Sequence, residues 1–294
     1  MDYVYHGGGV KGAAHIGVLK AFEEQRIEFD YISGTSSGSI VASLYAIGYS
    51  ADEIYNIFKK YCRQIKLFDL GNILKSILDI FIKNKFTMDG LNSGKKLEKI
   101  MEKTCKEKNI ENISEVKKCL LIPSVDLNNG EIYIFSSCNN DKRNYSDKII
   151  YINNIEIWKA VRASCGYPGV FSPYKYKSTE LIDGGIRENI PWKELKKIGV
   201  DKVISVVFSK DKKIKNEKNI IDVIDNSLDI LCHELSAYEL EGADYLIDIN
   251  TIDVSLLDFK KIDYLYELGY KCGKKYIQEK LIRNVKLVNK KQID

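Results

Sequence analysis

The sequence "YHGGGVKGAAHIG", residues Tyr5–Gly17, places a glycine-rich turn between a short strand-like run and a helical pattern. Glycine loses more backbone entropy on folding than any other residue, so this cluster indicates that another group must approach the backbone closely. A turn of this kind between a strand and a helix offers backbone N–H groups and the positive end of the helix dipole to an anion. Two anions fit: the pyrophosphate of a dinucleotide, and the oxyanion that forms during acyl transfer.

The dinucleotide interpretation has partial support. Gly7, Gly9 and Gly12 satisfy the pattern G-x-G-x-x-G between a predicted strand and a predicted helix. A dinucleotide-binding fold also needs an acidic residue at the end of its second strand, where it binds the ribose. Asp30 is at about the right distance along the chain, but it lies at the start of that strand. The acidic residue therefore does not favour a dinucleotide.

The stretch "SGTSSGS" follows the second predicted strand and contains G-x-S-x-G, formed by Gly34, Ser36 and Gly38. Between a strand and a helix, this pattern is typical of a nucleophile elbow, which exposes a serine hydroxyl at the start of a helix. Taken alone, the pattern is more often a Ser/Gly-rich helix N-cap than a catalytic turn. In a parallel sheet, however, this turn and the glycine turn emerge at the same edge. The two turns together therefore favour an oxyanion, rather than a pyrophosphate, as the anion that the glycine turn binds.

The rest of the chain alternates between predicted strands and predicted helices, which indicates an α/β fold. We expect a three-layer α/β/α arrangement around a mostly parallel central sheet. The predicted strands are 2–5, 31–32, 120–126, 131–136, 201–208 and 244–249, and the predicted helices are 12–25, 37–47, 51–62, 93–108, 154–164, 220–241 and 258–283. We expect one domain over residues 1–283 and a C-terminal tail over 284–294. Residues 65–92 are a candidate lid or lipid-contact segment, because 65–82 are rich in Ile, Leu and Phe.

The composition and charge of the chain argue against several classes of protein. The chain of 294 residues is 45% hydrophobic, which is enough for a packed core, and its net charge is only +4. The positive charge is nearly all lysine and is spread along the chain, which argues against nucleic-acid binding. Seven scattered cysteines without a CxxC pair predict reduced thiols rather than a disulfide framework. We see no signal peptide and no membrane-length span, so we expect a cytoplasmic protein with at most peripheral membrane contact.

A serine nucleophile needs a base, and the chain offers few histidines for this role. We interpret His6, His15 and His233 as structural or surface residues. The stretch "LIDGGIRENIP", residues 181–191, offers a carboxylate instead. There Asp183 precedes two glycines, and a proline closes the loop. An Asp-Gly turn alone would explain the first two residues, but not the second glycine and the downstream Asn-x-Pro.

Together these motifs resemble the patatin-like phospholipases. "GGGVKG" resembles the oxyanion loop of that family, "GTSSGS" its elbow and "DGG" its Asp-Gly-Gly signature. "RASCGYPGVFSP" (162–173) and "NIP" (189–191) resemble further family segments, and the resemblance covers roughly residues 1–275. Lys11 stands where the family commonly has arginine, so the positive charge is kept but the bidentate geometry is not.

The resemblance implies a lipid acyl hydrolase with a Ser–Asp dyad. Ser36 would be the nucleophile and Asp183 the base, and the N–H groups of Gly7, Gly8 and Gly9 would form the oxyanion hole. The other motif residues that it implies are Lys11, Gly12, Gly34, Gly38, Gly184 and Gly185. The family implies a phospholipid or another acyl lipid as substrate. No metal or cofactor is expected, because such a dyad needs neither.

Two alternatives stay open. Ser36, Asp183 and His233 follow the chain order of an α/β-hydrolase triad, and His6 to Gly9 match the HGGG of esterases. Against this, the elbow follows the glycine turn after one helix, whereas that fold places several elements between them. The second alternative is a non-catalytic nucleotide- or lipid-binding module that kept both loops.

Overall fold

The computed structural model describes residues 2–64, 90–138, 148–209, 220–251 and 254–291. Their centre is a nine-stranded sheet with the path β5-β4-β3-β2-β1-β8-β9, to which β7 adds beside β3 and β6 beside β7. The strands are β1 (Asp2–Tyr5), β2 (Tyr31–Gly34), β3 (Cys119–Asp126), β4 (Ile132–Ser136), β5 (Ile149–Ile152), β6 (Tyr174–Tyr176), β7 (Thr179–Asp183), β8 (Val203–Ser209) and β9 (Tyr245–Asn250). From β3 to β9 along this path, neighbouring strands are parallel.

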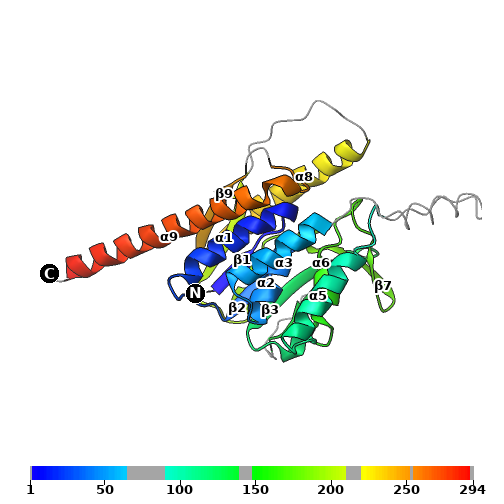
Figure 1. Ribbon diagram of the computed structural model, residues 1–294, viewed down its shortest axis with the longest axis horizontal. Helices are drawn as coiled ribbons and strands as arrows, with labels where there is room; N and C mark the ends of the chain where they lie inside the picture. The colour runs from blue at the N-terminus through cyan, green and yellow to red at the C-terminus, as the bar shows by residue number, and fades with distance from the viewer. Residues whose placement is uncertain (1, 65–89, 139–147, 210–219, 252–253, 292–294) are drawn as a thin grey trace, which may run out of the picture.

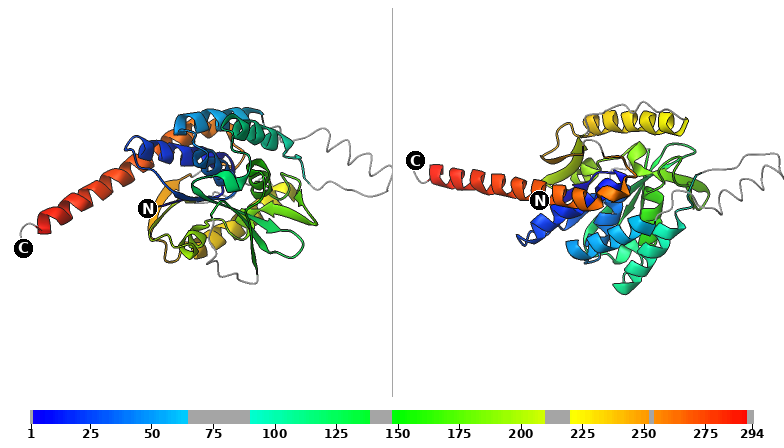
Figure 2. Two further views of the ribbon diagram at one scale, coloured as in Figure 1. Left: turned by 90° about the horizontal axis from the view of Figure 1, so that it is seen from below. Right: turned by 45° about the horizontal axis from the view of Figure 1, so that its top comes forward.

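Helices cover both faces of the sheet (Figures 1 and 2). They are α1 (Gly12–Glu23), α2 (Ser37–Ala46), α3 (Ala51–Gln64), α5 (Lys95–Glu107), α6 (Ile157–Ser164), α7 (Trp192–Lys197), α8 (Ile220–Glu239) and α9 (Ile262–Lys291). Figure 2 shows α8 on one side of the sheet and α1, α2, α3 and α9 on the other. This arrangement confirms the predicted three-layer α/β/α fold with a mostly parallel sheet.

The strands supply two hydrophobic cores because successive side chains point to opposite faces. In β1, Tyr3 and Tyr5 pack into the core beneath α1, α2 and α9, whereas Val4 packs into the core beneath α7. In β3, Leu120 packs into the same core as Tyr3 and Tyr5, and Leu121 packs into the same core as Val4. A strand with both faces buried reads as a continuous apolar run, which is why these strands were visible in the sequence.

Helices α1 and α9 cross with almost no space between their backbones. A Cβ atom at Gly17 would lie 2.0 Å from the Tyr266 carbonyl oxygen, and one at Gly269 would lie 1.9 Å from the Ala14 carbonyl oxygen. Helix α9 continues to Lys291, past the predicted end of the domain at residue 283, and its C-terminal part extends away from the sheet (Figure 1). The division into a domain and a tail stays a prediction, and residues 65–89 of the candidate lid lie outside the described residues.

Four elements were missed in the sequence: β5, β6, β7 and α7, each three to six residues long. The most consequential is β7, because Asp183 is its last residue and lies in a strand rather than in the predicted loop. β7 pairs antiparallel with β3, and Ser124 is the partner of Asp183. Such short strands carry too few residues for a periodic signal, and their pairing depends on chain segments far away in sequence.

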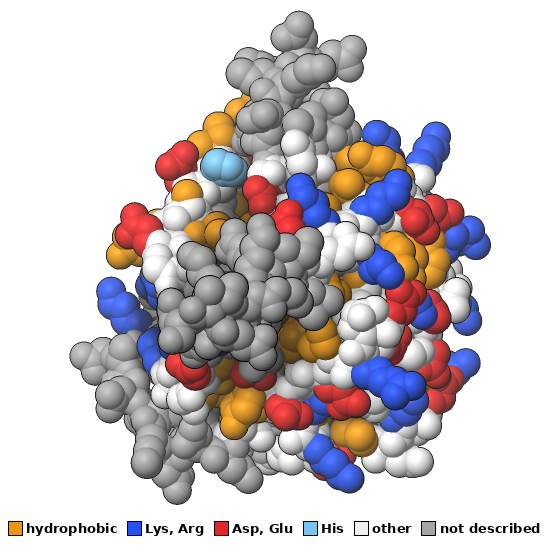
Figure 3. Space-filling view, turned by 90° about the vertical axis from the view of Figure 1, so that its left-hand side faces the viewer, with side chains coloured by type: hydrophobic (Ala, Val, Ile, Leu, Met, Phe, Trp, Pro, Cys, Tyr) orange, Lys and Arg blue, Asp and Glu red, His pale blue; other side chains and the backbone are white. Residues whose placement is uncertain are grey.

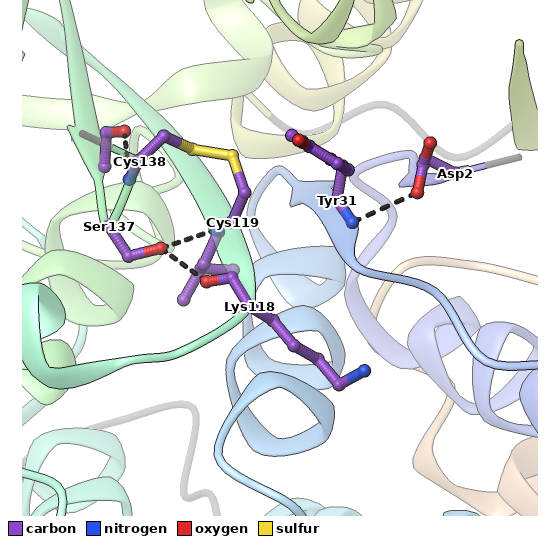
Figure 4. Close-up of a disulfide and its surroundings, with 8 residues drawn as sticks. Asp2, Tyr31, Lys118, Cys119, Ser137 and Cys138 are labelled. Atoms are coloured by element: carbon purple, nitrogen blue, oxygen red, sulfur yellow. Dashed lines mark hydrogen bonds between the residues drawn. A yellow bond between two sulfur atoms is a disulfide. The ribbon is translucent and has the colours of Figure 1, made fainter. Parts of the chain in front are cut away.

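The prediction that all cysteines are reduced is wrong for one pair. Cys119 and Cys138 form a disulfide, with Cα atoms 4.8 Å apart (Figure 4). The hairpin of β3 and β4 explains the pairing: Leu121 pairs with Ser136, and the same register two residues further on places the cysteines opposite each other. Cross-strand neighbours lie at the separation that a disulfide requires. Five other cysteines are free: Cys62, Cys105, Cys165, Cys232 and Cys272.

Charges of both signs are interspersed on the face shown in Figure 3, as expected for a solvated surface rather than a nucleic-acid stripe. Among the described residues, no helix combines the length and the apolar character needed to cross a bilayer.

Candidate active site

Ser36 occupies the sharp turn between β2 and α2. Its backbone has φ 52° and ψ −124°, a conformation that residues other than glycine rarely adopt. The two glycines of the motif make room for this turn. A Cβ atom at Gly34 would lie 2.4 Å from the Gly38 carbonyl oxygen, and one at Gly38 would lie 2.6 Å from the Tyr5 carbonyl oxygen. Ser36 therefore lies on a tight turn between a strand and a helix, and its assignment as a nucleophile elbow stays a prediction.

Hydrogen bonds from distant segments hold the elbow in this conformation. The Ser36 N–H donates to Ser164 Oγ at the end of α6 (3.0 Å). The Thr35 N–H donates to the Tyr5 carbonyl (3.1 Å), and Thr35 Oγ1 donates to the Glu188 carbonyl (2.9 Å). β1, α6 and the loop after Asp183 therefore fix the elbow from three sides.

Asp183 ends β7 and is only 3% exposed. Its Oδ1 accepts the Gly185 N–H at 2.8 Å. Burial raises the pKa of Asp183 to about 6, while hydrogen bonding by the Ser36 hydroxyl and the Gly185 N–H works in the opposite direction. A carboxyl group with this pKa is a stronger base than an ordinary aspartate and is still ionised at neutral pH.

The contact between Ser36 and Asp183 is loose. Asp183 Oδ2 makes no hydrogen bond of standard geometry with any described residue, although the Ser36 hydroxyl is close enough to affect the pKa of the carboxyl group. Catalytic hydrogen bonds in unliganded sites are often long or poorly aligned. The structure thus brings together the two residues that the sequence motifs singled out 147 positions apart.

The glycine turn runs directly beneath other parts of the chain. A Cβ atom at Gly8 would lie 2.8 Å from the Phe208 ring, and one at Gly9, where φ is +56°, would lie 2.4 Å from the Leu256 carbonyl oxygen. Protein atoms therefore already explain why no side chain is tolerated at these positions. The Gly7 N–H donates to Asn189 Oδ1 (3.2 Å), whereas the N–H groups of Gly8 and Gly9 donate to no described residue.

A cavity of about 170 Å³ joins these parts. Its polar lining includes Ser36, Asp183 and the Gly7–Gly9 turn. Most of the remaining lining is apolar and comprises Ile40, Phe58, Tyr61, Val170, Phe171, Ile186, Phe208, Leu256, Leu257 and Phe259. A few polar groups converging in an apolar pocket are typical of a site that binds an apolar ligand at a reactive centre.

The remaining motif residues lie around this cavity. Lys11 is buried and also lines it, with its Nζ 5.9 Å from the centre of the Phe208 ring. Gly12 lets α1 approach Phe58, since a Cβ atom there would lie 3.0 Å from the ring. A Cβ atom at Gly184 would lie 2.4 Å from the Pro123 carbonyl oxygen, so the turn after Asp183 also needs its first glycine.

The histidines have different environments. Burial lowers the pKa of both His6 and His15 to about 3, so both are neutral at physiological pH. His233 is exposed on α8 and lines the cavity, but no hydrogen bond joins it to Ser36 or Asp183 within the described residues.

Cys165 also lines the cavity, but burial raises the pKa of its thiol, which is the opposite of what activates a cysteine nucleophile.

Sequence reasoning missed the residues that support the site. Ser164 and Asn189 both lie in segments that the family resemblance pointed out, yet nothing in their local sequence indicated which backbone groups they bind. Glu239, which accepts the N–H groups of Asn189 and Ile190 at 2.9 Å each, had no local signal at all. These contacts join residues that are far apart in the chain, so only the folded chain defines them.

The profile of the family described as patatin-like phospholipase matches residues 4–196. The chain belongs to the patatin-like phospholipase family. The match begins in β1, ends in α7 and contains the glycine turn, the elbow and Asp183.

Curated relatives with similar sequences include proteins that are much longer than this patatin-like chain. It is 25% identical over 306 residues to a lysophospholipase NTE1 of Lodderomyces elongisporus, a match that covers 95% of the chain but only 19% of that relative. The chain thus spans about a fifth of the length of such relatives. It is 28% identical over 225 residues to the uncharacterized protein YqhO of Bacillus subtilis, with 75% of each chain covered.

Solved structures show the same fold. VipD from Legionella pneumophila aligns with 95% of this patatin-like chain and 66% of its own, with a TM-score of 0.52 and 16% identity. ExoU in its complex with SpcU from Pseudomonas aeruginosa aligns with 95% of this chain and 51% of its own, with a TM-score of 0.50 and 15% identity. At these identities the likeness concerns the fold alone.

Proposed function

We propose that this protein is a lipid acyl hydrolase that cleaves carboxylic ester bonds of phospholipids or related acyl lipids. The observation that carries the proposal is that Ser36, Asp183 and the glycine turn line one apolar cavity together. The lysophospholipase names of several relatives support an acyl lipid as substrate. An acyl chain matches the apolar wall of the cavity, and the ester carbonyl matches its polar end.

In the first half-reaction, Ser36 Oγ attacks the ester carbonyl carbon while Asp183 takes the hydroxyl proton. The carbonyl oxygen becomes an oxyanion and accepts hydrogen bonds from the N–H groups of Gly8 and Gly9. The intermediate then expels the alcohol of the substrate, to which Asp183 gives the proton, and leaves an acyl group on Ser36. The raised pKa of Asp183 suits both steps, because the group must accept and release a proton near neutral pH.

In the second half-reaction, a water molecule replaces the alcohol. Asp183 takes a proton from the water, the resulting hydroxide attacks the acyl-enzyme carbonyl, and the same N–H groups bind the second oxyanion. Collapse of this intermediate releases the fatty acid, and the proton returns from Asp183 to Ser36 Oγ. The step consumes one water molecule and restores both side chains.

The proposal is tested with a fluorophosphonate probe and a panel of lipids. We expect the probe to label the wild-type chain but not Ser36→Ala, and we expect both Ser36→Ala and Asp183→Asn to lose nearly all hydrolysis. Wild-type turnover by both variants would refute the dyad. Absence of labelling, together with no turnover of any lipid, would instead favour a non-catalytic binding module.

The Ser-His-Asp alternative makes a different prediction for His233, which lines the same cavity from α8. If Asp183 is the base, His233→Ala keeps most of the activity, because no proton passes through the imidazole. Near-complete loss of turnover in a folded His233→Ala variant would favour the triad. A cytoplasmic location with peripheral membrane contact also remains a proposal.

A further inference from the structure

Asn189 connects three parts of the site and is itself 5% exposed. It lies six residues after Asp183, in the Asn-x-Pro segment to which the mechanism above gives no role. Its side chain contacts the glycine turn at Gly7, the residue before that turn, His6, and helix α8 at Ser236. The His6 ring lies beside the same serine of α8, with its Nε2 3.2 Å from Ser236 Oγ.

The hydrogen bonds of the Asn189 side chain have only one consistent assignment. The Gly7 N–H can only donate, so it faces Oδ1 at 3.2 Å. The Nδ2 group then donates one hydrogen to His6 Nε2 and the other to Ser236 Oγ, both at 2.8 Å. Ser236 Oγ gives its own hydrogen to the Cys232 carbonyl at 2.7 Å. His6 Nε2 is therefore an acceptor, and the ring proton of neutral His6 lies on Nδ1.

The backbone of Asn189 is fixed as firmly as its side chain. Its N–H donates to Glu239 Oε1, and the Ile190 N–H donates to Glu239 Oε2, both at 2.9 Å. The indole N–H of Trp192 donates to the Glu239 carbonyl. The end of α8 therefore holds Asn189 in place, and Asn189 in turn holds the glycine turn.

The glycine turn needs such support because glycine imposes few restrictions on its own backbone. A donor that stabilises an oxyanion works only when it already points at the place where the charge develops. The Gly7 N–H is used internally by Asn189, and the bond fixes the backbone immediately before Gly8 and Gly9. A Cβ atom at Gly7 would lie 2.7 Å from Asn189 Oδ1, so the turn and the amide are in direct contact.

We propose that Asn189 is a positioning residue of the oxyanion hole, which orients the N–H groups of Gly8 and Gly9 through its hydrogen bonds to Gly7 and His6. This inference rests on the proposed function, since it assumes that an oxyanion forms in the cavity. It extends that function by assigning a role in the transition state to Asn189, which lines the cavity and acts through the backbone of the glycine turn.

Two substitutions separate the acceptor from the donors of the amide. Asn189→Leu has a similar volume and removes all three side-chain hydrogen bonds. Asn189→Asp keeps an oxygen for the Gly7 N–H and loses only the donors. We expect Asn189→Leu to lower kcat about 100-fold or more with KM within about threefold, the loss typical of one missing oxyanion donor. We expect Asn189→Asp to retain at least tenfold more activity than Asn189→Leu. Asn153→Leu and Asn153→Asp, made at an exposed asparagine, serve as matched controls.

An oxyanion mimic distinguishes positioning from general damage. A lipid trifluoromethyl ketone adds to the serine and forms an oxyanion, so its affinity should fall in Asn189→Leu by the same factor as kcat/KM. A lipid alcohol of equal chain length forms no oxyanion and should bind as it does to the wild type. Equal losses for both ligands would reduce Asn189 to a structural residue and overturn the inference.

A third measurement needs no variant. In ¹⁵N-histidine NMR of the wild-type chain, neutral His6 should carry its proton on Nδ1; an Nε2–H tautomer would contradict the donor assignment and overturn the inference. Failure of the proposed function is recognised separately, because it would leave even the wild-type chain unlabelled by the fluorophosphonate probe. Wild-type kcat and inhibitor affinity in Asn189→Leu, with labelling intact, would overturn this inference alone.

Discussion

The backbone N–H of Ser36 donates a hydrogen bond to the side-chain oxygen of Ser164, 3.0 Å away, although 128 residues separate the two in the chain. Ser164 is completely buried at the end of α6, and Ser36 holds an unfavourable backbone conformation between β2 and α2. The bond therefore stabilises the turn on which Ser36, the proposed nucleophile, lies. It also connects the elbow to the segment 165–171, which forms one wall of the cavity.

Replacing Ser164 by Ala should weaken both the fold and the reaction. The substitution leaves the Ser36 N–H buried without an acceptor, which costs about 1–3 kcal/mol. We expect the free energy of unfolding in urea to fall by about that amount and kcat to fall at least tenfold, because the elbow loses one of its restraints. Ser43→Ala is the matched control, since this buried hydroxyl on α2 has no partner among the described residues. Equal effects of the two substitutions would contradict the prediction.

The pH dependence of activity should follow the ionisation of Asp183. The base must be deprotonated to accept the Ser36 proton, and its pKa is raised to about 6, so kcat/KM should rise with pH and reach its plateau above about pH 7. The acidic limb should have its midpoint near pH 6. His233→Gln should keep this limb, because the proposed mechanism passes no proton through this imidazole. A midpoint near 4, the ordinary value for aspartate, would show that burial does not control this carboxyl group.

Replacing Gly9 by Ala should abolish turnover. An alanine there must adopt a φ of +56° and place its Cβ 2.4 Å from the Leu256 carbonyl oxygen, so the turn must move. Gly199→Ala shares the positive φ but meets no atom within 4 Å, which makes it the control for backbone strain alone. We expect kcat/KM to fall by about 100-fold or more in Gly9→Ala and to stay near the wild-type value in Gly199→Ala. Similar activities of the two variants would show that the close approach at Gly9 is unimportant.

Removing the disulfide should lower stability without lowering activity. Cys119 and Cys138 are separated by 19 residues, and closing a loop of that size contributes about 3 kcal/mol. Neither cysteine lines the cavity. We therefore expect the Cys119→Ser/Cys138→Ser double variant to unfold at a lower urea concentration while keeping wild-type kcat/KM at 25 °C. Unchanged stability in a non-reducing buffer would mean that the bond does not form in solution.

The order of the main strands and helices could be predicted from the residue pattern, which also pointed to Ser36 and Asp183 as the proposed reacting residues. Buried strands such as β1 and β8 are continuous apolar runs, and the two glycine motifs lie where strands meet helices, so their signals are local. The pairing of Cys119 with Cys138, in contrast, follows from the register of β3 and β4, which cysteine spacing alone did not indicate. Features that depend only on residues a few positions away in the chain can therefore be predicted from the sequence.

Tertiary structure alone decided how these pieces act together. β7 is a strand because β3 and β6 pair with it, and this placement buries Asp183, which raises its pKa. The restraints on Ser36 and Gly7 come from Ser164 and Asn189, which are 128 and 182 residues away in sequence. Burial and hydrogen bonding depend on which atoms surround a group in space. The order of residues along the chain does not show which atoms these are.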